Sequence, residues 1–239
     1  PSYPEEFNPN GRPIYERKLA TVDGETSFNG ATYALDRIVF EGGRFTVHAK
    51  HGTYFHSLAT SEYLEEEFLA RLSGDSDRAV NLSDLDHRRE LHRIAGGENV
   101  LFDGRGRAAA LSMAATVLVT EPDGTYSVIL PRRSTTVETH PLFAHVAPSG
   151  IFAPIGADRR EDPAEFSIRR CLLREYAEEL FGYKDLEQGR GILAEDVESL
   201  PPVRALLEAE EQEKVALRYC GIAVPLLTLR PEIYVLIFV

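Results

Sequence analysis

The sequence predicts a mixed α/β fold for its C-terminal half, preceded by a smaller α+β extension. An apolar run, a Pro-Asp-Gly turn and a second apolar run within 108–130 predict two paired strands. An amphipathic helix follows at 162–182, a Glu-rich helix at 201–214, and β-branched runs at 215–229 and 233–239. We therefore expect an N-terminal extension over residues 1–107 and an α/β domain over residues 108–239.

The extension begins with a lead-in that has little periodicity. Residues 1–36 are polar and contain the strong turn signal Asn-Pro-Asn-Gly at 8–11, which predicts an irregular arm. Two short runs at 37–40 and 44–50 flank Glu-Gly-Gly, and this pattern predicts a hairpin.

Two helices are predicted to complete the extension, over 61–72 and 83–94. The first carries four acids near its start, where the helix dipole favours negative charge, so we expect them to be structural. The second carries His87 and His92 five residues apart, on different faces, which predicts surface or capping roles rather than a zinc site.

The composition narrows the class of protein. A formal net charge of −12 argues against a nucleic-acid-binding surface, because such a surface needs a basic patch. No apolar stretch reaches the roughly 18 residues of a membrane span, and Pro1–Glu6 lacks the features of a signal peptide, so we expect a cytoplasmic protein with no membrane partner. The two cysteines cannot form a disulfide framework, and Cys171 is expected to be a buried structural thiol.

The helix predicted at 162–182 carries the clearest functional signal. Asp162 can cap its start, Pro163 suits the first helical position, Glu165 completes a capping box, and Gly182 suits a left-handed stop. Apolar residues recur at spacings of three and four along one side, which predicts packing on a core. These residues are Ile168, Leu172, Leu173, Tyr176 and Leu180.

Three carboxylates are predicted to share the flank beside that apolar side. At about 100° of rotation per residue, Glu175, Glu178 and Glu179 fall within a sector of roughly 100°. Like charges at this spacing repel one another, and a hard divalent cation such as Mg²⁺ would turn the repulsion into a binding site. The alternative is a solvated acidic face, which is common on helices.

The run Arg-Glu-Tyr-Ala-Glu-Glu at 174–179, on a helix that follows Gly150 and Gly156, resembles the Nudix box. The resemblance implies an α/β/α sandwich with a mixed central sheet. It also implies that Glu175, Glu178 and Glu179 bind Mg²⁺ or Mn²⁺, with Arg174 orienting a carboxylate. The sequence departs from the box at three places: Phe166 stands where the first Glu is expected, Arg160 where the first Gly is expected, and one extra residue precedes Gly182.

The resemblance also implies further site residues. A strand that ends in Arg132, Arg133 and Ser134 is typical of the opening of such domains, and the two arginines either contact substrate phosphate or are exposed strand-end charges. Gly150 or Gly156 would let main chain approach the metal and phosphates closely. Glu232, in the segment before the last apolar run, is the candidate for a late carboxylate that serves as metal ligand or base.

The implied activity is hydrolysis of a diphosphate bond in a nucleoside diphosphate linked to another group, with metal ions neutralising charge and activating water. A small phosphorylated molecule, derived from a nucleotide, is thus the expected partner. Two alternatives remain: a module that binds a nucleotide or sugar phosphate without hydrolysis, and an isomerase- or glycosylase-type use of the fold. We expect the extension either to cover the site or to mediate homodimerisation.

Overall fold

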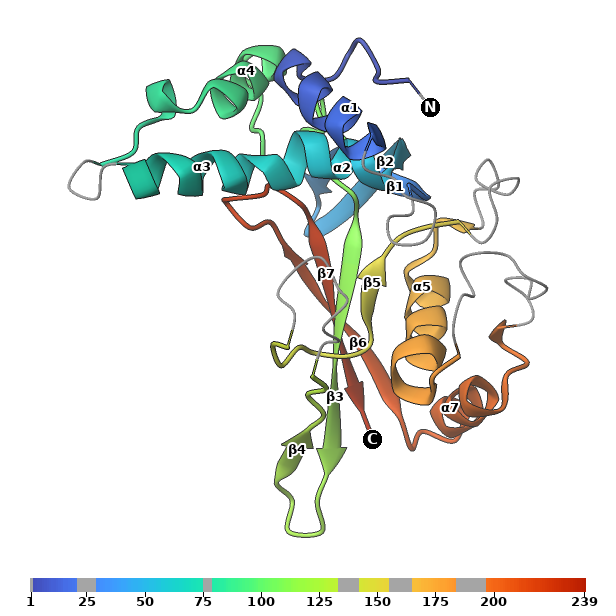
Figure 1. The fold of residues 1–239 in the computed structure, drawn as a ribbon. Helices are drawn as coiled ribbons and strands as arrows, with labels where there is room; N and C mark the ends of the chain where they lie inside the picture. Colours follow the sequence, from blue (N-terminus) through green and yellow to red (C-terminus); the bar gives the residue numbers. More distant parts are fainter. Residues whose placement is uncertain (1, 21–28, 75–78, 133–141, 155–164, 184–196) are drawn as a thin grey trace. The chain divides into compact units, whose positions relative to one another are not determined.

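The computed structural model describes residues 2–20, 29–74, 79–132, 142–154, 165–183 and 197–239. The chain divides into two compact units (Figure 1). Unit 1 comprises Pro1–Leu111 and Val224–Pro231, and unit 2 comprises Ser112–Ala223 and Glu232–Val239. The division lies close to the predicted boundary at 107/108, but the sequence placed 224–231 with the C-terminal domain, whereas the structure places it in unit 1.

Unit 1 is built on a two-stranded antiparallel hairpin and several helices. Strands β1 (Ala31–Glu41) and β2 (Arg44–Thr53) pair along their length, and Gly42 and Gly43 turn the chain with positive φ angles. The predicted hairpin is therefore confirmed, with longer strands. Ala109 and Leu111 continue the pairing on the other edge of β1, because the Leu35 N–H donates to the Ala109 carbonyl and the Leu111 N–H to the Tyr33 carbonyl.

The helices of unit 1 include two that the sequence did not predict, at Arg12–Ala20 and Tyr54–Ser57. The helices of this unit are α1 (Arg12–Ala20), α2 (Tyr54–Ser57), the π-helical η2 (Leu58–Glu62), α3 (Tyr63–Gly74) and α4 (Asp86–Ala95), with short 3₁₀ turns at Pro9–Gly11 and Leu82–Asp84. The expectation of an irregular arm over 1–36 is wrong for α1 and for the start of β1. Aromatic side chains anchor this region: Tyr3, Phe7 and Tyr15 are buried around the ring of His56.

Glu67 of α3 has a structural role, as the sequence predicted; the roles of Glu65 and Glu66 stay predictions. Both carboxylate oxygens of Glu67 accept hydrogen bonds from the first turn of α4, from the His87 N–H at 2.7 Å and the Arg88 N–H at 3.2 Å. They thereby satisfy donors that a helix start leaves unpaired. His87 itself is buried against Tyr63, so the surface or capping role expected for it is wrong.

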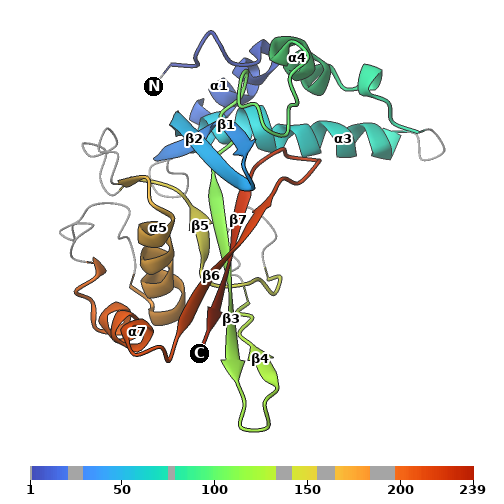
Figure 2. The ribbon, with the colours of Figure 1, turned by 180° about the vertical axis from the view of Figure 1, so that it is seen from behind.

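Unit 2 contains a mixed five-stranded sheet (Figures 1 and 2). Its strands are β3 (Ser112–Thr120), β4 (Tyr126–Val128), β5 (Ser149–Ile151), β6 (Ala216–Ala223) and β7 (Glu232–Phe238). The order is β4-β3-β7-β6, and β5 joins β3 on the same edge as β4. β3 and β7 run parallel, and the other pairs run antiparallel. The structure thus shows a mixed α/β fold.

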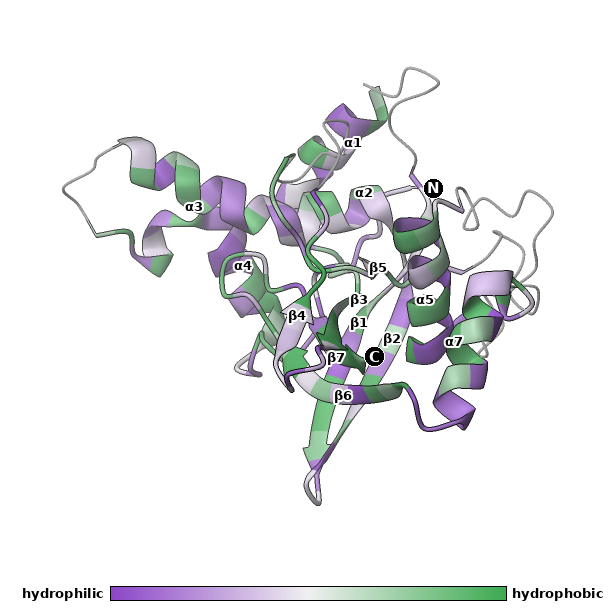
Figure 3. Ribbon diagram, turned by 90° about the horizontal axis from the view of Figure 1, so that it is seen from below, coloured by the Kyte–Doolittle hydropathy of each residue, from purple (hydrophilic) through white to green (hydrophobic). Residues whose placement is uncertain are grey.

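The helices of unit 2 are α5 (Ile168–Glu175), the π-helical turn η6 (Tyr176–Leu180) and α7 (Pro201–Glu211). α5 packs against β5 and β3, and α7 packs against η6. Both helices carry hydrophobic and hydrophilic stretches in alternation, as expected for helices with one packed side (Figure 3). The Arg169 guanidinium donates to both carboxylate oxygens of Glu210, at 3.2 and 2.6 Å, and joins α5 to α7.

The long helix predicted at 162–182 is shorter in the structure. The Ser167 hydroxyl caps α5 by accepting the Arg170 N–H, so the helix begins at Ile168 rather than at the predicted cap. Asp162 and Pro163 lie outside the described residues, and Glu165 is buried with Oε1 3.5 Å from Arg170 Nη1. Gly182 has φ +73°, which confirms the predicted left-handed stop.

Candidate functional site

The three glutamates of the Glu-rich run lie at the end of α5 and in η6. Glu175 is the last residue of α5 and is buried, Glu178 is half-buried, and Glu179 is exposed. The hydrogen bonds of η6 follow π-helical rather than α-helical geometry, so the α-helical rotation used for the sequence prediction does not hold past Glu175. π-Helical turns are frequent at functional sites.

Glu175 packs directly on the main chain of Gly150. A Cβ atom at position 150 would clash with the Glu175 carboxyl group, at 2.0 Å from Oε1 and 2.1 Å from the carboxyl carbon. Because only glycine lacks a Cβ atom, the Glu175 carboxylate can lie here only if residue 150 is glycine. The structure therefore brings together two residues that the sequence singled out separately.

Arg174 is held by its neighbours in the chain and by the strand beneath it. Its Nη2 donates to Glu175 Oε1 at 2.8 Å and to the Ile151 carbonyl at 2.9 Å, while Nη1 donates to the Ala153 carbonyl at 2.9 Å. The side chain is 2% exposed. Two main-chain carbonyls and the Glu175 carboxylate thus accept the hydrogen bonds of the Arg174 guanidinium.

Phe166, which stands where the first Glu of the pattern is expected, has a different environment. Its ring lies 5.6 Å from the ring of Phe152, centroid to centroid, and Phe152 is fully buried. This position therefore contributes to apolar packing beside α5.

Glu179 is joined to the first residue of β5. The Ser149 N–H donates to Glu179 Oε2 at 2.7 Å, and the Ser149 hydroxyl lies 3.4 Å from the same oxygen. The hydroxyl also lies 3.1 Å from Nδ1 of His145, and that Nδ1 lies 2.6 Å from the Val146 carbonyl oxygen. Ser149 thus bridges Glu179 and His145.

This bridge does not form a nucleophilic serine. A catalytic serine needs an acceptor nitrogen to remove its proton. The Val146 carbonyl can only accept, so Nδ1 of His145 carries a hydrogen and cannot act as that acceptor. We therefore place a hydrogen on Nδ1 of His145.

Glu232 begins β7, on the opposite face of the sheet from Glu175. Register places Glu232 and Ile151 on either side of Ser112, and Gly150 beside Met113. Neighbouring positions along a strand point to opposite faces, and Glu175 lies on the side to which a Cβ at Gly150 would point. The structure does not bring Glu232 together with Glu175.

The Glu232 carboxylate has two hydroxyl donors. The Ser112 hydroxyl lies 3.4 Å from Oε1, and the Tyr234 hydroxyl donates to Oε2 at 2.7 Å. The bond to Glu232 raises the pKa of Tyr234 to about 12, and burial adds to the shift. The role predicted for Glu232 at a metal site stays a prediction.

Of the two arginines after β4, the structure describes only Arg132. Arg132 is exposed and its Nε donates to the Leu142 carbonyl at 2.9 Å. Arg133 lies outside the described residues, as does Gly156, the alternative to Gly150. The prediction that Arg132 and Arg133 contact phosphate is therefore neither supported nor opposed.

The chemistry of the donor set suits a hard cation, since Glu175, Glu178 and Glu179 offer only carboxylate oxygens. The arrangement differs from an assembled site: in the described part of the chain, no three His, Cys, Asp or Glu side chains are gathered closely enough to hold a metal ion. Glu175 is turned toward Arg174. A cation at this site would thus share the Glu175 carboxylate with the guanidinium.

Sequence reasoning missed His145 and Ser149. His145 lies in the loop before β5 and Ser149 is the first residue of β5, and only the structure shows that Ser149 contacts both His145 and Glu179. Cys171 is buried, as expected. Among the described residues no helix is long and apolar enough to cross a membrane.

Comparisons of the chain with protein-family models, with curated proteins and with solved structures found no match.

Proposed function

We propose that this chain is a Nudix-type hydrolase that depends on Mg²⁺ or Mn²⁺ and cleaves a diphosphate bond in a nucleoside diphosphate linked to another group. The observation that carries the proposal is the contact of two box carboxylates with β5: Glu175 lies on Gly150, and Glu179 accepts the Ser149 N–H. The resemblance implies such a meeting of helix and main chain. The mixed sheet with parallel β3 and β7 is compatible with the proposed α/β/α sandwich.

In this proposal Glu175, Glu178 and Glu179 would hold the cation, which neutralises charge on the phosphates and lowers the pKa of a bound water. Arg174 fixes Glu175 through their ion pair, and the carbonyls of Ile151 and Ala153 fix Arg174 in turn. Ordering of the carboxylates before substrate arrives reduces the entropy lost on binding. Arg132 and Arg133 are assigned to a substrate phosphate, where a guanidinium can bind two oxygens.

The test uses the purified full chain with a panel of nucleotide-sugars, dinucleoside polyphosphates and nucleoside triphosphates, in Mg²⁺ or in EDTA. Metal-dependent release of a nucleotide, identified by mass spectrometry, is the expected result. Glu178→Gln should abolish turnover and leave the thermal melt unchanged. Glu208→Gln, at an exposed position of α7, is the matched control and should remain active. A fully active Glu178→Gln protein would remove Glu178 from the mechanism.

A second candidate is a module that binds the same class of ligand without hydrolysis. The observation that favours it is the buried Arg174–Glu175 pair, together with the lack of an assembled three-carboxylate cluster in the described residues. Binding of a panel member that raises the melting temperature, with no product in any metal, would support this module over the hydrolase. Products rearranged or cleaved at a glycosidic bond would instead indicate the isomerase or glycosylase alternative.

A further inference from the structure

We propose that Ser149, oriented by His145, is a positioning residue that holds Glu179 in place for a divalent cation. This inference rests on the proposed function, because it concerns a ligand of the same site. It adds two residues that neither the sequence pattern nor the resemblance assigns. Its structural basis is the chain of contacts from the Val146 carbonyl through His145 and Ser149 to Glu179.

Glu179 needs external support because of where it lies. It is exposed, it belongs to a π-helical turn, and a glutamate side chain has three rotatable bonds to restrict. By contrast, Glu175 is fixed by burial and by Arg174. The Ser149 N–H donates to Glu179 Oε2 at 2.7 Å and so supports this carboxylate from β5.

The direction of the Ser149 hydroxyl follows from the tautomer of His145. Nδ1 carries its hydrogen because the Val146 carbonyl is only an acceptor. The hydroxyl therefore cannot donate to Nδ1, and its oxygen shares the single Nδ1 hydrogen with the Val146 carbonyl, the two oxygens lying 3.1 and 2.6 Å from Nδ1. Its own hydrogen is left to point at Glu179 Oε2, 3.4 Å away. In these contacts His145 reaches Glu179 through Ser149.

Outer partners of this kind set the orientation of metal-binding carboxylates, and their removal weakens metal affinity by about 10- to 100-fold. The hydroxyl contact is long, and replacement of the side chain leaves the main-chain N–H in place. We therefore expect Ser149→Ala to weaken Mn²⁺ binding by about 10-fold. Ser149→Thr keeps a hydroxyl and should retain most of the affinity.

Two replacements of His145 separate positioning from proton transfer. The amide nitrogen of Asn falls near the place of Nδ1, so His145→Asn should keep Mn²⁺ affinity, whereas the amide of Gln falls near the place of Nε2, so His145→Gln should lose about as much as Ser149→Ala. A proton-transfer role at Nε2 predicts the opposite order in turnover.

The experiment measures Mn²⁺ affinity of the full chain by calorimetry and by electron paramagnetic resonance, and the His145 tautomer by ¹⁵N NMR. Ser127→Ala, in β4, is the control and should bind as the parent does. If the parent binds Mn²⁺ and Ser149→Ala binds it equally well, the positioning role is overturned and the proposed function is left intact. The same holds if NMR shows the Nε2–H tautomer of His145. A parent protein that binds no Mn²⁺ would overturn the proposed function, and this inference with it.

Discussion

Arg174 and Glu175, adjacent in sequence, form an ion pair in which Nη2 and Oε1 lie 2.8 Å apart and both side chains are buried. Adjacent residues on an α-helix do not normally face each other. The pair forms because two carbonyls of the β5 region draw the guanidinium under the helix end, where the Glu175 carboxylate also lies on Gly150. The Arg174–Glu175 pair and Gly150 therefore form one cluster of contacts between α5 and β5.

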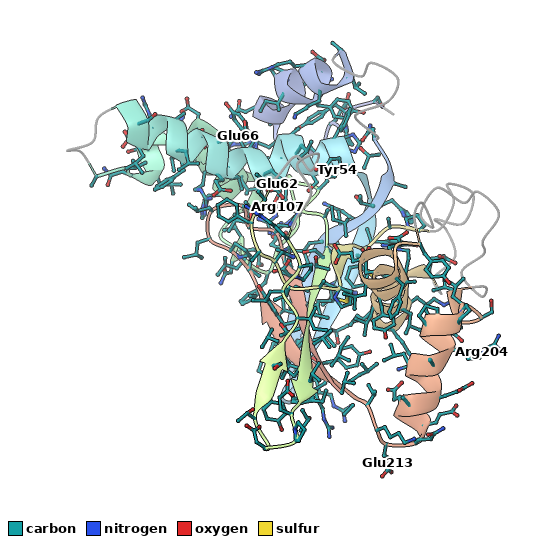
Figure 4. The ribbon with its side chains drawn as sticks, turned by 60° about the horizontal axis from the view of Figure 1, so that its bottom comes forward. Tyr54, Glu62, Glu66, Arg107, Arg204 and Glu213 are labelled. Atoms are coloured by element: carbon teal, nitrogen blue, oxygen red, sulfur yellow. The ribbon has the colours of Figure 1, made fainter. Side chains whose placement is uncertain are left out.

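Removal of one member of this pair should be costly. Arg174→Met keeps most of the volume but leaves Glu175 buried without its cation, which typically costs about 3–5 kcal/mol. Urea unfolding of the full chain measures this change. The double variant Arg174→Met/Glu175→Leu should recover most of the loss, and Arg204→Met, on an arginine that projects from α7 (Figure 4), should be within about 0.5 kcal/mol of the parent. A loss no larger than that of Arg204→Met would show that the pair contributes little.

Gly150→Ala should displace the Glu175 carboxylate, because the new methyl group would occupy its place. We expect a loss of about 1–3 kcal/mol, as for other overpacked sites, together with weakened Mn²⁺ binding. The control is Gly52→Ala in β2, where a Cβ would meet its neighbours at an ordinary 3.4 Å. Equal stability of the two variants would mean that the main chain at Gly150 moves aside.

The stability of the chain should fall in mild acid because of His87, which is 1% exposed. Burial lowers the pKa of His87 from 6.5 to about 4, and the nearby Arg88 adds to the shift. The unfolded chain therefore binds the proton more readily. The contribution of neutral His87 is complete above pH 6.5 and is lost as the pH falls toward 4, by about 3 kcal/mol in all.

Urea unfolding of the parent and of His87→Phe at pH 7 and pH 4.5 tests this linkage. The difference in unfolding free energy between the two pH values should be smaller in the variant, since carboxylates titrate in both proteins and cancel in the comparison. Burial also lowers the pKa of His56, so part of the acid sensitivity should persist. The same pH dependence in both proteins would contradict the role of His87.

Arg107 is a buried cation whose replacement should not harm unit 1. It is fully buried in that unit (Figure 4), and its Nη2 donates to the Val100 carbonyl at 2.7 Å. Its Nε and Nη1 have no hydrogen-bond partner among the described residues, and burial lowers its pKa to about 10. Apolar replacements of buried charges are often neutral or stabilising by about 1–4 kcal/mol.

Accordingly, Arg107→Met should unfold at the same urea concentration as the parent or at a higher one. Arg107→Ala should be destabilised by about 2–5 kcal/mol, because it leaves a cavity. A large loss of stability in Arg107→Met as well would indicate that the Arg107 charge has stabilising partners in solution.

The strands and helices in which apolar residues recur at regular spacing could be predicted from the sequence. The points where the chain passes from one compact unit to the other could not. Ala108 and Ala110 continue the small apolar run that becomes β3, yet in the structure they lie beside β1. Likewise, 224–229 continues the apolar run of β6. An apolar run predicts that its residues are buried, but it does not predict which helix or strand they pack against.

The part of the candidate site that depends on the identity of side chains could be predicted from the sequence. The three glutamates and Gly150 stand out by type and spacing. The partners of Arg174 are main-chain carbonyls, which every residue has, so the sequence gives no sign of them. The link from His145 to Glu179 depends on the path of the loop before β5, and the π-helical turn changes the spacing of the carboxylates.

The segment Val224–Pro231 leaves the sheet of unit 2 and returns to it. In unit 1 the Ser61 hydroxyl donates to the Thr228 carbonyl at 2.6 Å, Arg230 pairs with Glu62 at 3.0 Å, and Leu229 is buried in the cluster that contains Leu64 and Leu91. The chain therefore passes between the two units at three peptide bonds, 111/112, 223/224 and 231/232.

A recombinant fragment that stops at Leu111 would accordingly lack Leu229, and one that starts at Ser112 would present that leucine to water. We therefore expect both fragments to be less stable than the full chain. The segment between β6 and β7 belongs to unit 1, whereas both strands belong to unit 2. A protease cut within 224–231 should therefore destabilise both units.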